Sequence, residues 1–199
     1  HLKSVVLYTK EDSVLPPYDT CALNFIAAYR EFMSHFTAFG YRDIIYLGRE
    51  DQWESRACFR VLAEFGKKKA ESLVETAGYP SKPSWGNYYD ALYDRLKNGK
   101  IPDVVFTVND VAAAQACKCL NEFKLKVPQH VAVVGSDNQM LSSFCSPSIA
   151  SIDRNYEQVA ALLYEMLMKR INQTDAEFEY RKIDCSCVFR ESADIISKF

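Results

Sequence analysis

The sequence predicts an α/β protein built on a parallel sheet that helices cover on both faces. Short apolar stretches alternate with amphipathic stretches of ten or more residues along most of the chain. Two of the apolar stretches, DVVFTV at 103–108 and VAVVG at 131–135, are almost continuously apolar, as strands buried on both faces are. Such alternation forms βαβ units, and these place ligands beyond the carboxyl ends of their strands.

The individual elements follow from local patterns. Short runs rich in β-branched and aromatic residues predict strands at 5–8, 21–23, 43–47, 71–76, 103–108, 131–135 and 150–152, with an extended segment at 180–189. Apolar residues recurring every three or four positions predict helices at 25–39, 54–65, 85–96, 110–123 and 155–171. Asn24 is expected to cap the first helix, and Gly40 and Gly66 are expected to end the first two helices.

Composition narrows the class of protein. The chain has 199 residues, of which 48% are hydrophobic, so it is long enough to bury a core. A formal net charge of −2 argues against a nucleic-acid-binding surface, since phosphate binding needs clustered cations. No apolar run has the roughly 18 residues of a membrane span. The start of the chain has too short an apolar run for a signal peptide. Seven cysteines, an odd number, indicate reduced thiols in a cytoplasmic protein.

Motifs for metal or cofactor chemistry are missing from the sequence. Cys117 and Cys119 lie two apart on a predicted helix and point to different faces, and Cys185 and Cys187 have no second pair at zinc-ribbon spacing. The three histidines have no partners that would form a triad, and there is no P-loop and no G-x-G-x-x-G. We therefore predict no metal, no cofactor and no enzymatic activity.

Polar residues come directly after three of the predicted strands. Asp137 lies two residues beyond VAVVG, where a carboxylate can accept hydrogen bonds from two neighbouring ligand hydroxyls or can simply close a turn. Asn109 and Asp110 come after DVVFTV, where they can bind a ligand or only cap the next helix. Arg49 and Arg56 come after DIIYL with Trp53 between them, as ligand donors or as surface residues at a helix start.

Five segments resemble, in order, the signature blocks of the LacI/GalR (lactose/galactose repressor) family of transcriptional regulators. The segment PDVVFTVNDVAAA at 102–114 is similar to the family block P-(D/T)-A-(V/I)-F-x-x-N-D-x-x-A-x-G, and LKVPQHVAVVGSDN at 125–138 is similar to L-R-V-P-x-D-V-(S/A)-V-(V/I)-G-(Y/F)-D-(D/N). The further matches lie at 35–44, 146–152 and 188–192. Together they cover nearly the whole chain.

The resemblance implies a type I periplasmic-binding-protein-like effector domain, with two lobes that are parallel-sheet three-layer sandwiches joined by three chain crossings. We expect a complete C-lobe at 42–153 and 187–199. We expect only a remnant of the N-lobe, at 1–41 and 154–186. The DNA-binding helix-turn-helix of the family has no counterpart in this chain, which we therefore expect to be a truncated part of a longer regulator.

The resemblance also suggests effector-binding residues. Asp137 matches the family's hydroxyl-binding aspartate, and Asn109 and Asp110 match its N-D pair. Arg56 is the candidate for the family's effector arginine, although strict alignment puts Ser55 at that position. Trp85 or Tyr79 is expected to supply an aromatic wall. The full set of expected effector-binding residues is Asp137, Asn109, Arg56, Asp110, Trp85, Tyr156, Arg154 and Arg49.

These expectations amount to the sensing portion of a transcriptional regulator, a homodimer that binds a small-molecule effector, a carbohydrate, between its lobes. DNA would be bound only through a helix-turn-helix outside this chain. One alternative is a periplasmic sugar-binding transport protein of the same fold, which would need a signal peptide and fits poorly with an odd number of cysteines. Another is an α/β enzyme, for which no nucleophile–base pair is visible.

Overall fold

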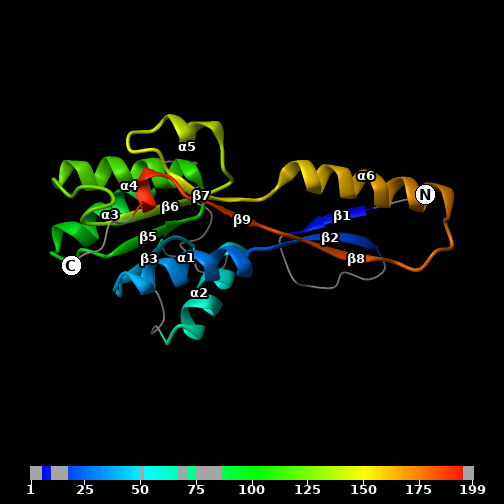
Figure 1. The fold of residues 1–199 in the computed structure, drawn as a ribbon, viewed down its shortest axis with the longest axis horizontal. Coiled ribbons are helices and arrows are strands. Elements are labelled where there is room, and N and C mark those ends of the chain that lie inside the picture. Colours follow the sequence, from blue (N-terminus) through cyan, green and yellow to red (C-terminus); the bar gives the residue numbers. More distant parts are fainter. Residues whose placement is uncertain (1–5, 10–17, 50–51, 67–70, 75–86, 195–199) are drawn as a thin grey trace.

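The computed structural model describes residues 6–9, 18–49, 52–66, 71–74 and 87–194, which form two lobes joined by a narrow waist (Figure 1). The strands are β1 (Val6–Thr9), β2 (Asp19–Asn24), β3 (Ile44–Arg49), β4 (Glu71–Val74), β5 (Val104–Thr107), β6 (Ala132–Ser136), β7 (Ala150–Asp153), β8 (Tyr180–Asp184) and β9 (Ser186–Val188). The helices are α1 (Ile26–Ala38), α2 (Trp53–Glu64), α3 (Asn87–Lys97), α4 (Asp110–Glu122), α5 (Met140–Phe144), α6 (Tyr156–Asn172) and the 3₁₀ turn η1 (Glu191–Ala193).

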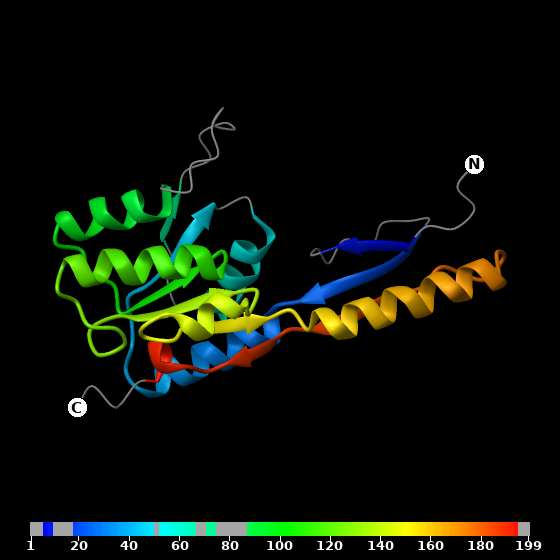
Figure 2. The ribbon, with the colours of Figure 1, turned by 90° about the horizontal axis from the view of Figure 1, so that it is seen from above.

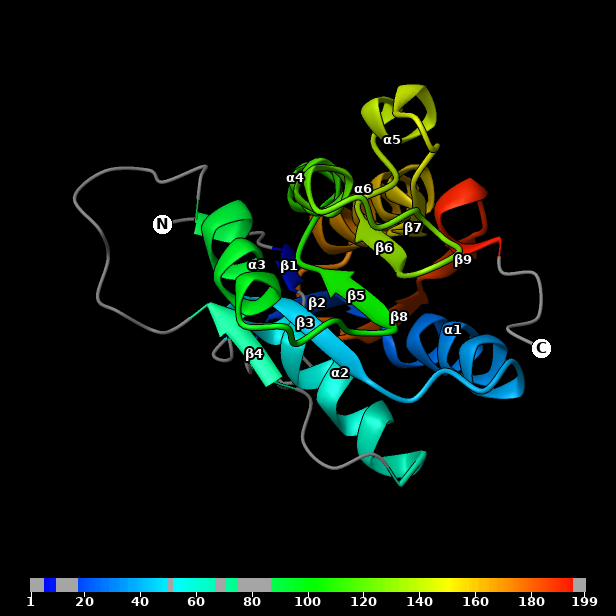
Figure 3. The ribbon, with the colours of Figure 1, turned by 90° about the vertical axis from the view of Figure 1, so that its left-hand side faces the viewer.

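The larger lobe contains a six-stranded sheet in the order β4-β3-β5-β6-β7-β9. All neighbouring strands pair in parallel except β7 and β9, which are antiparallel. Helices α3 and α4 cover one face of this sheet, and α1 and α2 cover the other (Figure 3). The sequence-based prediction of an α/β fold with a parallel sheet covered on both faces is therefore confirmed.

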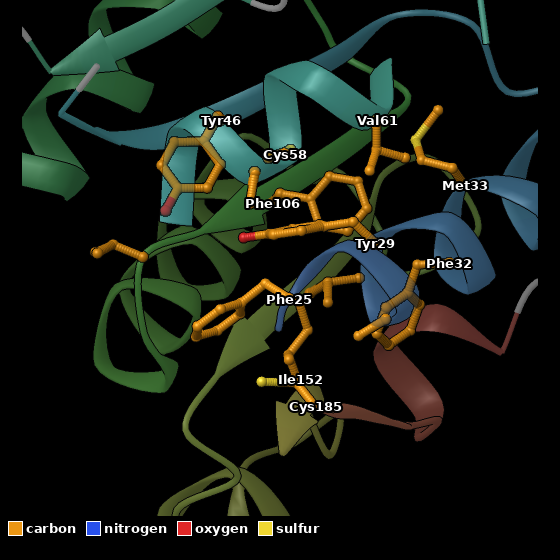
Figure 4. Packing of buried hydrophobic residues seen from close by; sticks show 14 of the residues in the cluster. Phe25, Tyr29, Phe32, Met33, Tyr46, Cys58, Val61, Phe106, Ile152 and Cys185 are labelled. Carbon is orange, nitrogen blue, oxygen red and sulfur yellow. The ribbon is translucent and has the colours of Figure 1, made fainter. Parts of the chain in front are cut away.

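Alternate residues of each central strand supply the two cores of the larger lobe. On the α1 and α2 side, the ring of Phe106 packs edge-on against Tyr29, Phe32 and Phe36 of α1, at centroid distances of 5.5, 6.2 and 5.9 Å (Figure 4). On the opposite side, its neighbour Val105 packs with apolar residues of α3 and α4. Period-two alternation along β5 thus places successive side chains in different cores.

The smaller lobe contains three parallel strands in the order β1-β2-β8, with α6 packed against β1 and β2 (Figure 2). A buried ion pair ties its far end together. The guanidinium of Arg170, near the end of α6, donates two hydrogen bonds to the carboxylate of Asp19 at the start of β2, at 2.7 and 3.0 Å. Arg170 also donates to the carbonyls of Thr174, Ala176 and Glu177, so one side chain closes the turn that leads to β8.

The packing of α1 differs from the sequence-based lobe boundary at residue 41. This helix packs on the six-stranded sheet, because the face formed by Ala28, Tyr29, Phe32 and Phe36 is apolar and lies against Phe106. We therefore place the first crossing between the lobes just after β2. The other crossings run from β7 into α6 and from β8 into β9, since these paired elements belong to different lobes.

Most predicted elements agree with the structure in type and order, and three details differ. Helix α5 was not predicted, since five residues are too few to show a period. The N-cap of α1 is Phe25, without a side-chain hydrogen bond, although Asn24 Oδ1 accepts one from the amide of Ile26 at 3.2 Å. The predicted extended segment 180–189 divides between the sheets.

Gly40 and Gly66 have φ of 80° and 66°, as expected for helix ends. No helix in the described residues combines the length and apolarity needed to span a membrane.

Candidate functional site

The candidate site lies at the waist, where strands of both lobes end. By connectivity, the carboxyl ends of β2, β7 and β8 lead directly into the three crossings. Strands β1 and β2 point toward the larger lobe and β3 points back toward the smaller one (Figure 2). Ligands of open parallel sheets bind beyond carboxyl ends. The two lobes therefore present their ligand-binding edges to each other.

Asp137 comes directly after β6 at this edge. Its φ of 103° is unusual for a residue with a side chain, and its amide is fixed by a 2.9 Å hydrogen bond to the carbonyl of Ile152. The carboxylate forms a close ion pair with the guanidinium of Arg154, and the Asp137 side chain remains 15% exposed. Asp137 therefore joins the end of β6 to the crossing that leaves β7.

Arg154 is the buried cation of the site. It is only 5% exposed, its Nη2 lies 3.4 Å from Glu54 Oε1, and its guanidinium carbon lies 5.5 Å from the ring centroid of Phe25. Burial lowers the pKa of Arg154, but the nearby acidic groups, Asp137 first, more than offset this and leave it raised. Its buried Nε has no hydrogen-bond acceptor among the described residues. A buried donor without an acceptor is costly, so a ligand oxygen here would be stabilised.

The smaller lobe adds two phenols near Arg154. Tyr8 on β1 and Tyr156 at the start of α6 both act electrostatically on this guanidinium. Burial, followed by the proximity of Tyr156, raises the pKa of Tyr8 to about 12. The Tyr8 hydroxyl thus stays protonated at neutral pH and can donate or accept a hydrogen bond. Both side chains are substantially exposed, at 39% and 49%.

Asn109 and Asp110 serve the fold at this edge. Asn109 Oδ1 accepts the amide of Ala112 at 2.9 Å and so caps α4. Asp110 is fully buried, accepting from Ser151 Oγ and from the amide of Gln139, both at 2.6 Å. The burial of Asp110 argues against the expected contact with a ligand. Desolvation raises its pKa, although both hydrogen bonds oppose the rise. Asp110 instead holds the segment just beyond Asp137.

The arginines expected on α2 and β3 differ in exposure. Arg56 is exposed and lines a hollow of about 140 Å³ together with Arg60 and Trp53. Arg49 is half-buried, and its charge opposes the rise that burial gives the pKa of Tyr88. Ser55, which strict alignment puts at the position of the family's effector arginine, is fully buried. The expected aromatic residues Trp85 and Tyr79 lie outside the described residues.

Two residues of the site escaped the sequence analysis. In the sequence, Glu54 is an ordinary acidic residue in the first turn of a predicted helix. In the structure, it is only 5% exposed. Phe25 reads as one of many apolar residues on α1, yet it lies under Arg154 and packs against Trp53 at 5.4 Å. The one available signal for Glu54 was its position just beyond a predicted parallel strand.

A chain of hydrogen bonds links the residue after Asp137 to two crossings. Asn138 Nδ2 donates to Asp153 Oδ2 at 2.8 Å, and Asp153 Oδ1 accepts the amide of Asn155 at 2.7 Å. Asn155 Nδ2 then donates to the carbonyl of Asp184, at the end of β8, at 2.7 Å. These contacts fix the loop after β6 relative to the connections between the lobes.

Comparison with known proteins places this arrangement in a family. Residues 33–193 match the family profile described as periplasmic binding protein-like domain, which covers most of the chain. The chain therefore belongs to the periplasmic-binding-protein-like domain family. Within it, the chain is an effector-binding domain of the LacI-type transcriptional regulators, whose repressors and regulators are its relatives. These relatives are not enzymes.

Among the curated relatives, the chain is 30% identical over 130 residues to the HTH-type transcriptional repressor PurR of Histophilus somni (strain 2336), covering 61% of this chain and 39% of the repressor. It is 34% identical over 85 residues to the ribose operon repressor of Escherichia coli (strain K12), covering 43% of this chain and 26% of the repressor. The chain thus matches less than half the length of these relatives.

Solved structures share the fold at lower identity. The transcriptional regulator CelR in complex with cellobiose has a TM-score of 0.77 and 19% identity, covering 94% of this chain and 58% of that one. A LacI family transcriptional regulator from Arthrobacter sp. FB24 in complex with lactose has a TM-score of 0.80 and 18% identity, covering 96% and 71%. The dimeric Lac repressor with an 11-residue C-terminal deletion has a TM-score of 0.74 and 18% identity, covering 87% and 63%.

Proposed function

We propose that this chain is the sensing portion of a transcriptional regulator and that it binds a sugar between its two lobes. The observation that carries the proposal is the buried pair of Asp137 and Arg154 at the waist. It offers carboxylate oxygens that accept hydrogen bonds beside a guanidinium Nε that lacks an acceptor among the described residues. Adjacent ligand hydroxyls both donate and accept hydrogen bonds, so they complement this pair.

The remaining contacts of a sugar come from both lobes. Phenols of Tyr8 and Tyr156 stand on the smaller lobe, and the half-buried ring of Trp53, which packs against Phe25, stands on the larger one. Sugars present apolar ring faces as well as hydroxyls, and a mostly apolar site with a few placed polar groups suits them. A ligand held from both sides favours one relative orientation of the lobes.

We infer that this reorientation changes the operator affinity of the full-length protein through a DNA-binding domain outside this chain. Homodimer formation would present two such domains to a two-fold operator, as symmetric regulators do. The sugar complexes among the structural relatives support a carbohydrate effector. All seven cysteines are free thiols, which favours a reducing compartment.

The test uses the full-length protein in a thermal-shift screen against pentoses, hexoses, disaccharides and purines, followed by calorimetry on each hit. A ligand far above its dissociation constant raises the melting temperature by mass action. Asp137→Asn should weaken binding of a sugar hit by roughly 10- to 150-fold, because a hydrogen bond to a charged group is lost. Asp94→Asn makes the same change on the exposed surface of α3 and should bind like wild type.

Operator binding completes the test. A sugar hit that shifts operator affinity in wild type, and shifts it only at higher concentration in Asp137→Asn, is the expected result. A sugar hit whose affinity is unaffected by Asp137→Asn would remove Asp137 from the site. Binding of purines alone would overturn the carbohydrate assignment.

A further inference from the structure

We infer that Glu54 is a specificity-determining residue that makes the site select uncharged ligands and reject anionic ones such as sugar phosphates. The inference rests on the proposed function, since it concerns the same ligand. Nothing in the sequence motifs marks Glu54 for this role. It follows from the burial of its carboxylate and from the balance of charge around Arg154.

The carboxylate of Glu54 is held inside the waist. Glu54 lies in the first turn of α2 and is 5% exposed, and its Oε1 faces Arg154 Nη2 at 3.4 Å. Asp137 binds the same guanidinium from the end of β6. Buried carboxylates are rare unless paired, so Arg154 accounts for the presence of a charge here.

Two carboxylates share one guanidinium, so this group of three residues carries a net charge of −1. The strongest electrostatic influences on Arg154 come from the acids Asp137 and Glu54 and from two phenols. The cations Arg56 and Arg60 line a hollow that shares Trp53 with the candidate site, but both side chains are exposed, so solvent and salt screen their charge. Arg49, at the end of β3, is half-buried and acts electrostatically on Tyr88.

An anionic ligand would meet this excess negative charge in a water-poor site. A phosphate near Arg154 would compete with Asp137 and Glu54 for the same guanidinium and would bring further negative charge against both carboxylates. Like charges brought together at an interface are strongly unfavourable. An uncharged sugar meets no such repulsion, because its hydroxyls donate to Asp137 and its oxygens accept from Arg154 Nε.

The two carboxylates have different parts in this arrangement. The Asp137 side chain is 15% exposed and can reach a ligand, whereas that of Glu54 is 6% exposed. Glu54 therefore influences ligand binding through its negative charge and through Arg154, without contacting the ligand. Replacing it by Gln keeps its shape and removes the charge, which separates electrostatic rejection from lack of space.

The test measures, with the full-length protein, the affinities for ribose, glucose, lactose and cellobiose, for the phosphate monoester of each, and for an uncharged acetyl ester of the same hydroxyl. Wild type should bind a sugar about 100-fold or more tightly than it binds the phosphate monoester of that sugar. The affinity for the acetyl ester should be much closer to that for the free sugar. In Glu54→Gln, the ratio of the affinity for the sugar to that for its phosphate should fall by about tenfold. The ratio of the affinity for the sugar to that for its acetyl ester should stay unchanged.

Glu64→Gln is the matched control. Glu64 ends the same helix and also pairs with an arginine, Arg30, at 2.6 Å, but this pair lies on the surface. The control should keep the wild-type preference. If Glu54→Gln does not fold, the sulfate monoester of the same sugar supplies the second measurement with wild type. It has nearly the shape of the phosphate monoester but less negative charge at neutral pH, so wild type should reject it less strongly.

The outcomes separate this inference from the proposed function. If no sugar in the panel binds, the proposed function fails. If a sugar binds and its phosphate binds equally well, the selection against anions is wrong while the sugar site stands. If wild type rejects the phosphate and the sulfate monoester equally and Glu54→Gln leaves that rejection unchanged, shape excludes the phosphate and the role of Glu54 is wrong.

Discussion

The two lobes of this chain are stabilised in different ways. The larger lobe buries a six-stranded sheet between two layers of helices, with an aromatic cluster around Phe106 as its centre. The smaller lobe has three strands and one helix, and a buried ion pair between Asp19 and Arg170 closes its far end. The larger lobe therefore has apolar cores on both faces of its sheet, whereas the smaller lobe combines an apolar layer between α6 and its strands with a buried ion pair.

The residues of the proposed sugar site lie where the two lobes meet. Asp137 and Glu54 stand on the larger lobe, Tyr8 and Tyr156 on the smaller, and Arg154 on a crossing that joins them. A well-packed lobe can hold a buried charged pair in place, because interiors at high packing density resist small displacements. The three crossings connect this lobe to the smaller one, so a ligand held between the lobes would favour one relative orientation of them.

The largest expected effect tests the apolar core of the larger lobe. Phe106→Ala removes a ring that contacts three aromatic side chains of α1, and it should lower the free energy of unfolding by about 3–5 kcal/mol. Phe144→Ala deletes the same ring where it is 79% exposed and should change stability by no more than about 0.5 kcal/mol. Urea denaturation of both variants checks this. Equal losses of unfolding free energy in the two variants would mean that the aromatic cluster is not the centre of the core.

A smaller loss is expected where the larger lobe supports the site. A Cβ on Gly135 would lie 2.2 Å from Asp110 Oδ1 and 3.2 Å from the Asp110 backbone. Because two hydrogen bonds hold the Asp110 side chain, Gly135→Ala should cost about 2–3 kcal/mol by thermal denaturation. The loss should be smaller in an Asp110→Ala background, where the clash with the side chain is removed. An additive double mutant would contradict this packing.

The smallest effect is a difference in pH dependence between the lobes. The hydrogen bonds from Arg170 hold the pKa of Asp19 below its usual value of 3.8, so the stabilisation it gives the smaller lobe is present above that pH and is lost as pH falls through the folded pKa. Burial raises the pKa of Asp110, so its contribution is present below pH 3.8 and is lost as pH rises through the folded pKa.

Hydrogen exchange resolved by segment distinguishes these two effects. Relative to the intrinsic exchange rate, which itself falls in acid, the protection of amides in β2 and α6 should decrease in wild type as the pH falls. Asp19→Asn should already show lower protection there at neutral pH, with little further change in acid. Asp110→Asn should remove the opposite dependence from α4 and β6. Equal responses of both lobes to Asp19→Asn would show that the lobes do not differ in the way described.

The sequence predicted the sheet and its helices, because these depend on periodic apolar runs. It also placed Asp137 just beyond β6, and the role of Asp137 in binding stays a prediction. It did not predict where α1 packs, since an apolar face fits any apolar surface and only the fold decides which one. It also missed Glu54, whose burial depends on Arg154, a residue 100 positions away. Asn109 and Asp110 were expected as ligand contacts or caps, and the structure assigns them supporting hydrogen bonds because both lie where α4 begins.

The most direct test of a sugar site at the waist is a crystal structure of the full-length protein with the sugar that binds best. We expect ligand density between the lobes, with hydroxyls bonded to the carboxylate of Asp137 and an oxygen accepting from Arg154 Nε. Density away from the waist, for example in the hollow of about 530 Å³ between α4 and residues 145–147, would contradict this assignment.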